Sequence, residues 1–412
     1  MLLLLPSRSR REKPATLWRP YLSFSISRKI ITVYGATGNQ GGSVVNSLLE
    51  NKSGDLKIRG ITRDPDSDKS QALAARGVDI VKGDGLSKEQ MLEAFQGTWT
   101  VFLNSNSVDP ALHQPGGITE NNHGKEVVDA AFEAGVEVLI YSGSASSAKI
   151  TNGSITSAGM DEKYLVSDAK TKGFKSAVNV GTGWYMENHF NPEVAGLLGG
   201  LPYAEDEDGC LTLAMPNWGG DNTIPFISIG DDYGDTVHGG FSQLATPEEL
   251  VAAVQKASGK NSRFNEVKDW TTIETHGEPE IETVKNLFGF VQYTGGRFFG
   301  VPSDVTLSKK LKAAATTAKG RPASDGKLTT VEQFAKKALS AEVGESESLR
   351  MMMHALLYEI NGHEVENKHY QYSLLGIGQG AIEVLDEASE HSTDNDIFAT
   401  TGSGWHFIKY SK

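Results

Sequence analysis

The chain has 412 residues and a net charge of −13, with 38% hydrophobic and 22% charged residues. This length allows two or three domains with a sizeable core, and the acidic balance argues against broad binding to nucleic-acid phosphates. Its single cysteine, Cys210, excludes disulfide pairing within the chain, and the absence of an apolar run of 18 residues argues against a membrane-spanning helix.

The first 29 residues differ in composition from the rest of the chain. They contain seven Lys or Arg residues against one acid, Glu12, and they are rich in serine. We expect residues 1–29 to form a basic, disordered extension of a cytoplasmic protein. The same composition is typical of mitochondrial presequences, so a mitochondrial location stays open as the alternative.

Residues 30–185 alternate between short apolar runs and amphipathic stretches, which predicts an α/β fold. We expect a Rossmann-type doubly wound parallel sheet with a ligand at the carboxyl ends of its strands. In the first predicted helix, Val44 and Val45 share one apolar face with Leu48 and Leu49. In the third, Ser87 and Gln90 have the spacing of a helix capping box. The predicted strands are 29–34, 55–63, 78–84, 98–106, 136–144 and 174–183, and the predicted helices are 41–51, 67–77, 87–97, 120–135 and 157–173.

The pattern is weaker after residue 185. Residues 186–342 combine turn-rich short strands with helical patterns at 246–259, 278–296 and 329–339, and we interpret them as a smaller, C-terminal substrate-side lobe. Residues 343–412 contain five of the ten histidines and an acidic stretch with little periodicity. We expect this atypical tail to be poorly ordered, and its histidine spacings match no metal-ligand motif.

A glycine-rich bend separates the first predicted strand from the first helix. Residues 35–41 read G-x-x-G-x-x-G, in which the first glycine permits a tight turn and the second lets the backbone approach a diphosphate. The third lets the helix pack against the strand, and the helix N-terminus offers free amides to the phosphates. We expect a dinucleotide to contact Gly35, Thr37, Gly38, Asn39, Gln40 and Gly41.

The ends of the next strands supply candidate contacts to the rest of such a ligand. Arg63, about 20 residues beyond the bend, could clamp a ribose 2′-phosphate, which favours NADP over NAD; the alternative is a solvated loop arginine. The following Asp64 could instead hold a ribose hydroxyl. Asp84 follows the third strand and could meet the adenine, or it is a turn residue. Asn104 and Ser105 end the fourth strand, where the nicotinamide ribose would pass.

These segments carry a family resemblance. The stretches VYGATGNQGGSVV, GITRDP, VKGD, VLIYSGS and AGMDEKYLVSDA resemble the NmrA-like family of atypical short-chain dehydrogenases over roughly residues 30–340. The resemblance implies a Rossmann domain, a small C-terminal lobe and a preference for NADP. The family contains both reductases and redox-sensing regulators that bind the dinucleotide without turning it over.

The resemblance also suggests a catalytic residue. The Tyr-x-x-x-Lys spacing of short-chain dehydrogenases is absent, because Tyr141 is followed by Ala145 four residues on, and Tyr164 by Asp168. Residues 160–163, Met-Asp-Glu-Lys, match the Phe-Asp-x-Lys pattern of the family's reductases, with Met in place of Phe. We predict Lys163 to be catalytic and to contact the cofactor; the alternative is an ordinary surface lysine, and sensor members can retain it.

Two further groups complete the predicted site. Ser142, between Tyr141 and Gly143 at the end of the fifth strand, is expected to line the cofactor; the alternative is a purely structural strand end. In the segment GTGWYMENH, three residues are expected to face the substrate or, alternatively, to pack within a loop. These substrate candidates are Tyr185, Glu187 and Asn188.

The sequence therefore supports competing functions. The first is an oxidoreductase that transfers hydride between NADPH and a small carbonyl or enone. The second is a non-catalytic NAD(P) redox sensor or transcriptional regulator that binds a partner protein, and the third is a Rossmann scaffold without ligand. We expect a small-molecule substrate or a regulatory protein as partner, no direct nucleic-acid or membrane contact and no metal, and the pattern does not indicate an oligomeric state.

Overall fold

The computed structural model describes residues 28–52, 54, 56–107, 109–114, 116–167 and 173–340, with short strands at 383–384, 396–401 and 404–409. The chain divides into two compact units, residues 1–342 and 343–412. The expectation for residues 1–27 lies outside the described part. Of the helices described, none combines the length and the hydropathy needed to cross a bilayer.

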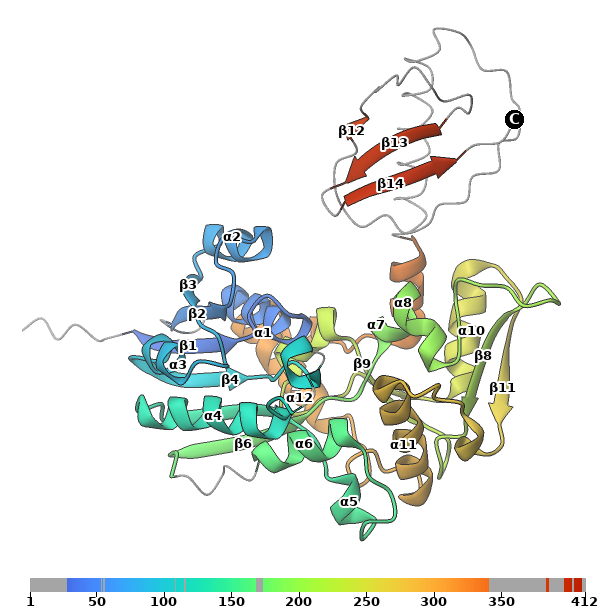
Figure 1. Cartoon of the computed structure of the whole chain (residues 1–412), viewed down its shortest axis with the longest axis horizontal. Coiled ribbons are helices and arrows are strands. Elements are labelled where there is room, and N and C mark those ends of the chain that lie inside the picture. Colours follow the sequence, from blue (N-terminus) through green and yellow to red (C-terminus); the bar gives the residue numbers. More distant parts are fainter. Residues whose placement is uncertain are drawn as a thin grey trace, which may run out of the picture. The chain divides into compact units, whose positions relative to one another are not determined.

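A six-stranded sheet organises the first unit (Figure 1). Its order is β3-β2-β1-β4-β5-β6, and every neighbouring pair is parallel. This arrangement confirms the predicted doubly wound α/β fold, whose strand order reverses between β1 and β4. The strands are β1 (Lys29–Tyr34), β2 (Leu56–Thr62), β3 (Asp79–Lys82), β4 (Thr98–Leu103), β5 (Val138–Gly143) and β6 (Ser176–Gly181).

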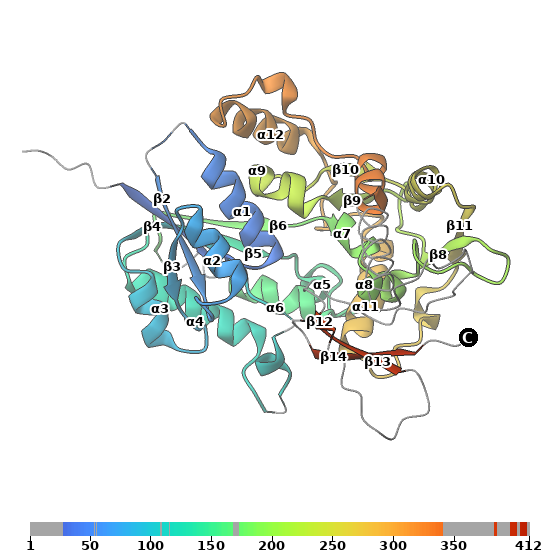
Figure 2. The same cartoon turned by 90° about the horizontal axis from the view of Figure 1, so that it is seen from above.

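Helices cover both faces of this sheet (Figures 1 and 2). One core holds α1 and α2 against the sheet, and it includes the predicted apolar face of α1, with Val44 and Val45 buried and Leu48 and Leu49 packed beside them. A second core holds α3 and α4 on the other face, with α6 beside α4. These helices are α1 (Asn39–Glu50), α2 (Asp68–Ala75), α3 (Lys88–Ala94), α4 (Glu120–Glu133) and α6 (Ala158–Ser167).

The predicted capping box at α3 is half wrong. The Ser87 hydroxyl accepts a hydrogen bond from the Gln90 amide at 3.4 Å, as predicted for an N-cap. However, Gln90 Oε1 accepts from the amide of Asp84 at 3.2 Å, so the reciprocal bond to Ser87 is missing. The glutamine side chain reaches back because the turn before α3 leaves the Asp84 amide without a helical acceptor.

The second lobe follows β6 and has a core of its own. At its centre Trp218 packs edge to face against Trp184 and Phe288, and α10 begins with a full capping box between Thr246 and Glu249. Strands β10, β9 and β7 form one small sheet, and β8 pairs in parallel with β11. The elements after β6 are β7 (Trp184–Tyr185), α7 (Met186–His189), α8 (Pro192–Ala195), β8 (Leu211–Pro216), β9 (Ile224–Ile227), α9 (Gly234–Thr236), β10 (Gln243–Ala245), α10 (Pro247–Ser258), β11 (Ser262–Val267), α11 (Pro279–Tyr293) and α12 (Thr306–Ala318). The short helix α5 (Ser147–Ile150) lies earlier in the chain, between β5 and α6.

Short helical turns connect several of these elements, and residues 331–340 form a helix, as predicted for this stretch. The helices predicted at 246–259 and 278–296 correspond to α10 and α11, whereas α12 was not predicted. The turns are η1 (Pro110–His113), η3 (Gly196–Leu198), η4 (Ile229–Tyr233), η5 (Trp270–Thr272) and η6 (Ala323–Asp325). In the second unit, β12 (Glu383–Val384), β13 (Asp396–Thr401) and β14 (Gly404–Lys409) form an antiparallel sheet, and the remaining expectation for residues 343–412 lies outside the described residues.

The second lobe returns to pack against α1. Ile227, Ile229 and Tyr233 are buried in the same core as the α1 face. The Ser43 hydroxyl of α1 donates to the carbonyl of Ile229 at 2.5 Å and accepts from the amide of Gly234 at 2.9 Å. The helix that begins at the glycine bend is therefore held on its far side by the second lobe.

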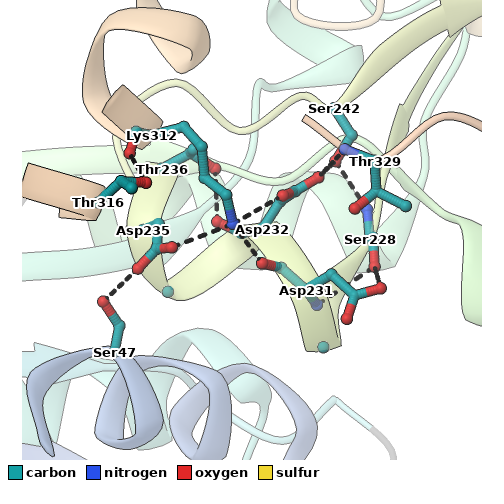
Figure 3. Close-up of polar contacts among 12 residues, drawn as sticks. Ser47, Ser228, Asp231, Asp232, Asp235, Thr236, Ser242, Lys312, Thr316 and Thr329 are labelled. Carbon is teal, nitrogen blue, oxygen red and sulfur yellow. Dashed lines mark hydrogen bonds and ion pairs between the residues drawn. The ribbon is translucent and has the colours of Figure 1, made fainter. Parts of the chain in front are cut away.

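A buried ion network fastens this contact (Figure 3). Lys312 of α12 lies 2.9 Å from Asp232 and 3.0 Å from Asp235, and the side chain of Asp232 is completely buried. Asp232 also accepts from the Ser242 hydroxyl at 2.6 Å and from the Thr329 amide at 2.8 Å. Burial alone would lower the pKa of Lys312, but the two aspartates raise it above its ordinary value.

Replacing Asp232 by alanine should destabilise the protein strongly, because it removes one of the two carboxylates that pair with the buried Lys312 and leaves the Ser242 hydroxyl and the Thr329 amide without their acceptor. We expect Asp232→Ala to lower the free energy of unfolding by about 3–5 kcal/mol, measured by urea denaturation. Lys337→Ala is the control, since Lys337 is 65% exposed in its pair with Asp231 and should cost less than about 1 kcal/mol. Equal effects of the two substitutions would contradict this account.

His189 is a buried titratable group in the second lobe. Its side chain is almost fully buried beside Trp184 and Phe226. Trp184 Nε1 donates to His189 Nε2 at 2.8 Å, which requires that nitrogen to carry no proton. Burial lowers the pKa of His189 from 6.5 to about 4.

This shift predicts a loss of stability on mild acidification. Between pH 6.5 and 4 the unfolded chain binds a proton at His189 that the folded chain does not bind, so the free energy of unfolding falls as pH falls. The full loss from this group is about 3 kcal/mol. His189→Gln keeps an acceptor for Trp184 without the titration, so the difference between its unfolding free energy and that of the wild type should change across this pH range. A constant difference would refute the assignment.

Candidate functional site

The bend between β1 and α1 has the geometry that its three glycines predict. Gly35 has φ +74°, in the left-handed region that favours glycine, and its carbonyl accepts from the Gly38 amide at 3.0 Å. A Cβ on Gly41 would lie 2.1 Å from the Gly35 carbonyl oxygen. The first turn of α1 can therefore approach the end of β1 only because residue 41 has no side chain.

The bend leaves a set of backbone donors at the start of α1. The N-cap, Gly38, has no side chain with which to cap the helix, and the first helical bond runs from the Gly42 amide to the Gly38 carbonyl at 2.7 Å. The amides of Asn39, Gln40 and Gly41 therefore have no acceptor within the helix. Together with the helix dipole they form an anion-binding end at the carboxyl edge of the sheet.

Lys163 lies at this same edge of the sheet. Its Nζ is 3.1 Å from both the carbonyl and the hydroxyl of Ser105, just beyond β4, and 2.8 Å from Glu120 Oε1 on α4. The Ser105 hydroxyl donates to the same Glu120 oxygen at 2.6 Å. The hydroxyl of Tyr141 lies 3.3 Å from the hydroxyl of Ser105. The structure thus brings together the predicted Lys163 and Ser105 with Tyr141 of β5.

Glu120 is the member of this cluster that sequence reasoning missed. It is the first residue of α4 after the N-cap Thr119, where an acid is expected for its interaction with the helix dipole. In the folded chain its side chain is only 8% exposed and accepts from Lys163, Ser105 and Ser107. Its burial depends on the distant α6, which the local sequence does not indicate.

Gln40 joins the glycine bend to the predicted Ser142 and Tyr185. Its side-chain carbonyl accepts from the Ser142 hydroxyl at 2.6 Å, and its amide nitrogen donates to the Tyr185 hydroxyl. Burial raises the pKa of Tyr185 above its ordinary value. The Gln40 side chain is thus committed to the ends of β5 and β7, while its backbone amide stays at the helix N-terminus.

Arg63 directly follows β2, outside the glycine bend. Its guanidinium forms an ion pair with Asp109 at 2.7 Å, and its own side chain is 57% exposed. The neighbouring carboxylates stabilise their own turns, since Asp64 accepts from the Asp66 amide at 3.1 Å and Asp84 from the Leu86 amide at 3.0 Å. Asp84 therefore stabilises a turn, as the alternative interpretation predicted, and its contact with an adenine stays a prediction.

The comparisons with known proteins identify the family. The model of the NmrA-like family matches residues 27–335. The chain belongs to the NmrA-like family. It is 41% identical over 334 residues to an NmrA-like family domain-containing oxidoreductase, FrzB, of Cladobotryum sp, covering 76% of this chain and 99% of the relative. It is also 41% identical over 329 residues to the similarly described lnaB of Aspergillus flavus, covering 75% and 98%.

Solved structures show the same NmrA-like fold at lower identity. NmrA, described as a negative transcriptional regulator in complex with NADP, aligns with a TM-score of 0.55 at 18% identity over 76% of this chain and 96% of NmrA. An NADPH-dependent quinone oxidoreductase of Escherichia coli complexed with NADPH aligns with a TM-score of 0.53 at 20% identity over 75% and 99%. At such identities these likenesses concern the fold.

The NmrA-like Met-Asp-Glu-Lys segment is held by its acidic members. Asp161 accepts hydrogen bonds from the Ser146 and Ser147 hydroxyls at 2.7 and 2.8 Å, and Glu162 accepts from the Asn121 amide at 2.8 Å. Met160 is buried in the core of the second lobe. The segment therefore fixes α6 on three sides, and these contacts orient Lys163.

The remaining substrate candidates have other neighbours. Glu187 accepts from the Gly230 amide at 2.9 Å, and burial raises its pKa above the ordinary value. Asn188 is half-buried in the short helix α7. Asn104 Oδ1 is buried and has no hydrogen-bond partner among the described residues. Thr37 is half-buried in the glycine bend, and ligand contacts for these residues stay predictions.

A surface hollow of about 530 Å³ lies in the second lobe between α10 and β11. It contains none of the predicted site residues, and its cations are already in ion pairs, as with Lys256 and Glu332 or Arg263 and Asp206. The described residues also contain no cluster of three or more potential metal ligands. The carboxyl edge of the sheet, where the predicted residues lie, is the candidate site.

The geometry of the bend requires glycine at residue 41 but not at residue 42. Gly41→Ala should disrupt the turn, because the new Cβ would collide with backbone that cannot move independently. In Gly42→Ala the new Cβ would lie 3.6 Å from the nearest atom, an ordinary contact, and alanine in the helix should stabilise by about 0.5–1 kcal/mol. Thermal unfolding should show a lower Tm for the first and an unchanged or higher Tm for the second. Similar Tm values would show that the bend tolerates a side chain.

Proposed function

We propose that this chain is an NAD(P)-binding oxidoreductase that acts on a small carbonyl or enone. Its oxidoreductase assignment is supported by the descriptions of the relatives at 41% identity. The observation that carries the proposal is that the Lys163 ammonium lies 3.1 Å from the Ser105 hydroxyl at the same sheet edge as the glycine bend. The Lys163 ammonium is thus held at the carboxyl edge of the sheet, where doubly wound folds bind their ligands.

The residues of the bend fit a dinucleotide. The diphosphate would be held by the amides of Asn39, Gln40 and Gly41, at the end of α1 that lies against Gly35 because residue 41 has no side chain. Asn104, whose Oδ1 is buried without a described partner, is suited to a ribose hydroxyl. When bound, the nicotinamide would supply or accept hydride.

Lys163 would act on the substrate oxygen. As negative charge develops there during reduction, the ammonium would stabilise it and donate a proton from Nζ. Glu120 and Ser105 would act as positioning residues, because their oxygens accept from this ammonium and fix its direction. Tyr185, with its hydroxyl bound to Gln40, would lie beside the substrate.

The preferred cofactor in this proposal is NADP. Arg63 is exposed at the end of β2, and a guanidinium can bind a phosphate through two parallel hydrogen bonds. An Arg63→Ala variant that loses affinity for NADPH and NADH equally would remove this part of the proposal.

A second candidate function is a redox sensor that binds the dinucleotide without turnover. It is favoured by the hydrogen bonding of Lys163. Glu120 and the carbonyl and hydroxyl of Ser105 together can accept all three protons of its ammonium. Such a lysine could be structural. The solved NmrA, described as a transcriptional regulator in complex with NADP, has the same fold.

Removing the ammonium should separate the two functions. We expect Lys163→Met to lower turnover of quinones, enones or aldehydes by at least about 100-fold, while the Kd for NADPH measured by calorimetry changes little. Because the single substitution leaves Glu120 buried without its cation, the double variant Lys163→Met with Glu120→Gln serves as the control that removes both charges. It should bind NADPH and remain inactive.

Each outcome decides between the candidates. NADPH binding by the wild type without turnover of any substrate in the panel would favour the sensor. Retained turnover in both lysine variants would show that Lys163 has no catalytic role. Absence of binding to NADPH and NADH would overturn both functions.

A further inference from the structure

Arg63, which would bind the 2′-phosphate of the cofactor's ribose, already forms an ion pair with Asp109. Asp109 lies in the segment between β4 and α4, far from Arg63 in sequence, and one of its carboxylate oxygens is 2.7 Å from the guanidinium. The other oxygen accepts from the Ala111 amide at 3.1 Å, where Asp109 is the N-cap of η1. Its side chain is 16% exposed, against 57% for Arg63.

These contacts make the carboxylate the fixed member of the pair. The hydrogen bond to the η1 backbone holds Asp109 in place, whereas the exposed arginine can change rotamer at little cost. An anion that approaches Arg63 therefore meets a carboxylate that stays nearby. The approach of any phosphate to this position is opposed by that like charge.

Other charges surround the same position. Burial is the main reason that the pKa of Tyr34, at the end of β1, is raised to about 12, but Asp84 and Asp109 raise it further and Arg63 opposes them. The charges of Asp84, Asp109 and Arg63 are therefore all close enough to affect the Tyr34 hydroxyl. Asp64 and Asp66 lie one and three residues after Arg63, so two further carboxylates are close to it in sequence.

We propose that Asp109 is a specificity-determining residue that weakens the preference of this site for a 2′-phosphorylated dinucleotide. The proposal rests on the cofactor assignment made above. A phosphate monoester carries between one and two negative charges near neutral pH and must share Arg63 with the carboxylate. A free ribose hydroxyl can instead donate to Asp109, so the same carboxylate supports the cofactor that lacks the phosphate.

The test is Asp109→Asn in the full chain. Asparagine keeps the N-cap of η1 but removes the charge. We expect NADPH and 2′,5′-ADP to bind about fivefold more tightly, the effect of removing one like charge at a solvated site. The affinity for NADH should be unchanged or lower, and calorimetry measures all three dissociation constants without a need for turnover.

Two further variants make the outcomes decisive. Asp66→Asn removes an equal charge from the exposed turn next to Arg63 and should change the NADPH to NADH ratio less than twofold. Arg63→Ala should abolish the preference for NADPH, and adding Asp109→Asn to it should then have little further effect. A change below twofold in Asp109→Asn, or a loss of NADPH affinity, would overturn the role of Asp109.

The failure of this proposal can be told from a failure of the proposed function. If the wild type binds neither dinucleotide, the function itself falls, and with it the role of Asp109. If the wild type binds NADPH and Arg63→Ala reduces that affinity, but Asp109→Asn does not alter it, only the role of Asp109 is refuted.

Discussion

The close approach between the Gly35 carbonyl and the first turn of α1 is the constraint on which the rest of the structure depends. A Cβ at residue 41 would lie 2.1 Å from that oxygen, so the chain can turn from β1 into α1 here only without a side chain. The turn directs the unpaired amides of α1 to the edge where β1 and β4 diverge. Every other candidate contact is arranged around these amides.

The second lobe secures that helix from its opposite side. Ser43 and Ser47 of α1 bond to the 229–235 segment, and Lys312 of α12 ties the same segment to the lobe through Asp232 and Asp235. The desolvation of these charges is offset by their mutual attraction and by added hydrogen bonds. Helix α1 and the second lobe are thus parts of one packed arrangement.

Charge is distributed differently at the two ends of the site. At Lys163 a buried carboxylate, Glu120, compensates and orients the cation, and the pair faces the edge of the sheet. At Arg63 the compensating Asp109 is held by the backbone, and the cation is the exposed partner. The buried pair holds the Lys163 ammonium in one orientation. The exposed Arg63 can instead leave Asp109 and bind another anion.

The sequence by itself determined the strand and helix pattern, the glycine bend and the family, because hydrophobic periodicity and backbone conformation are local properties. It also indicated Lys163 and Ser105, but their contact was decided by the packing of α6 against α4. Glu120 looked like an ordinary first-turn acid, α12 had no distinctive signal, and Asp109 lay in a loop far from Arg63 in sequence. These pairings depend on tertiary structure because the energy of a buried or paired charge is set by neighbours that are distant along the chain.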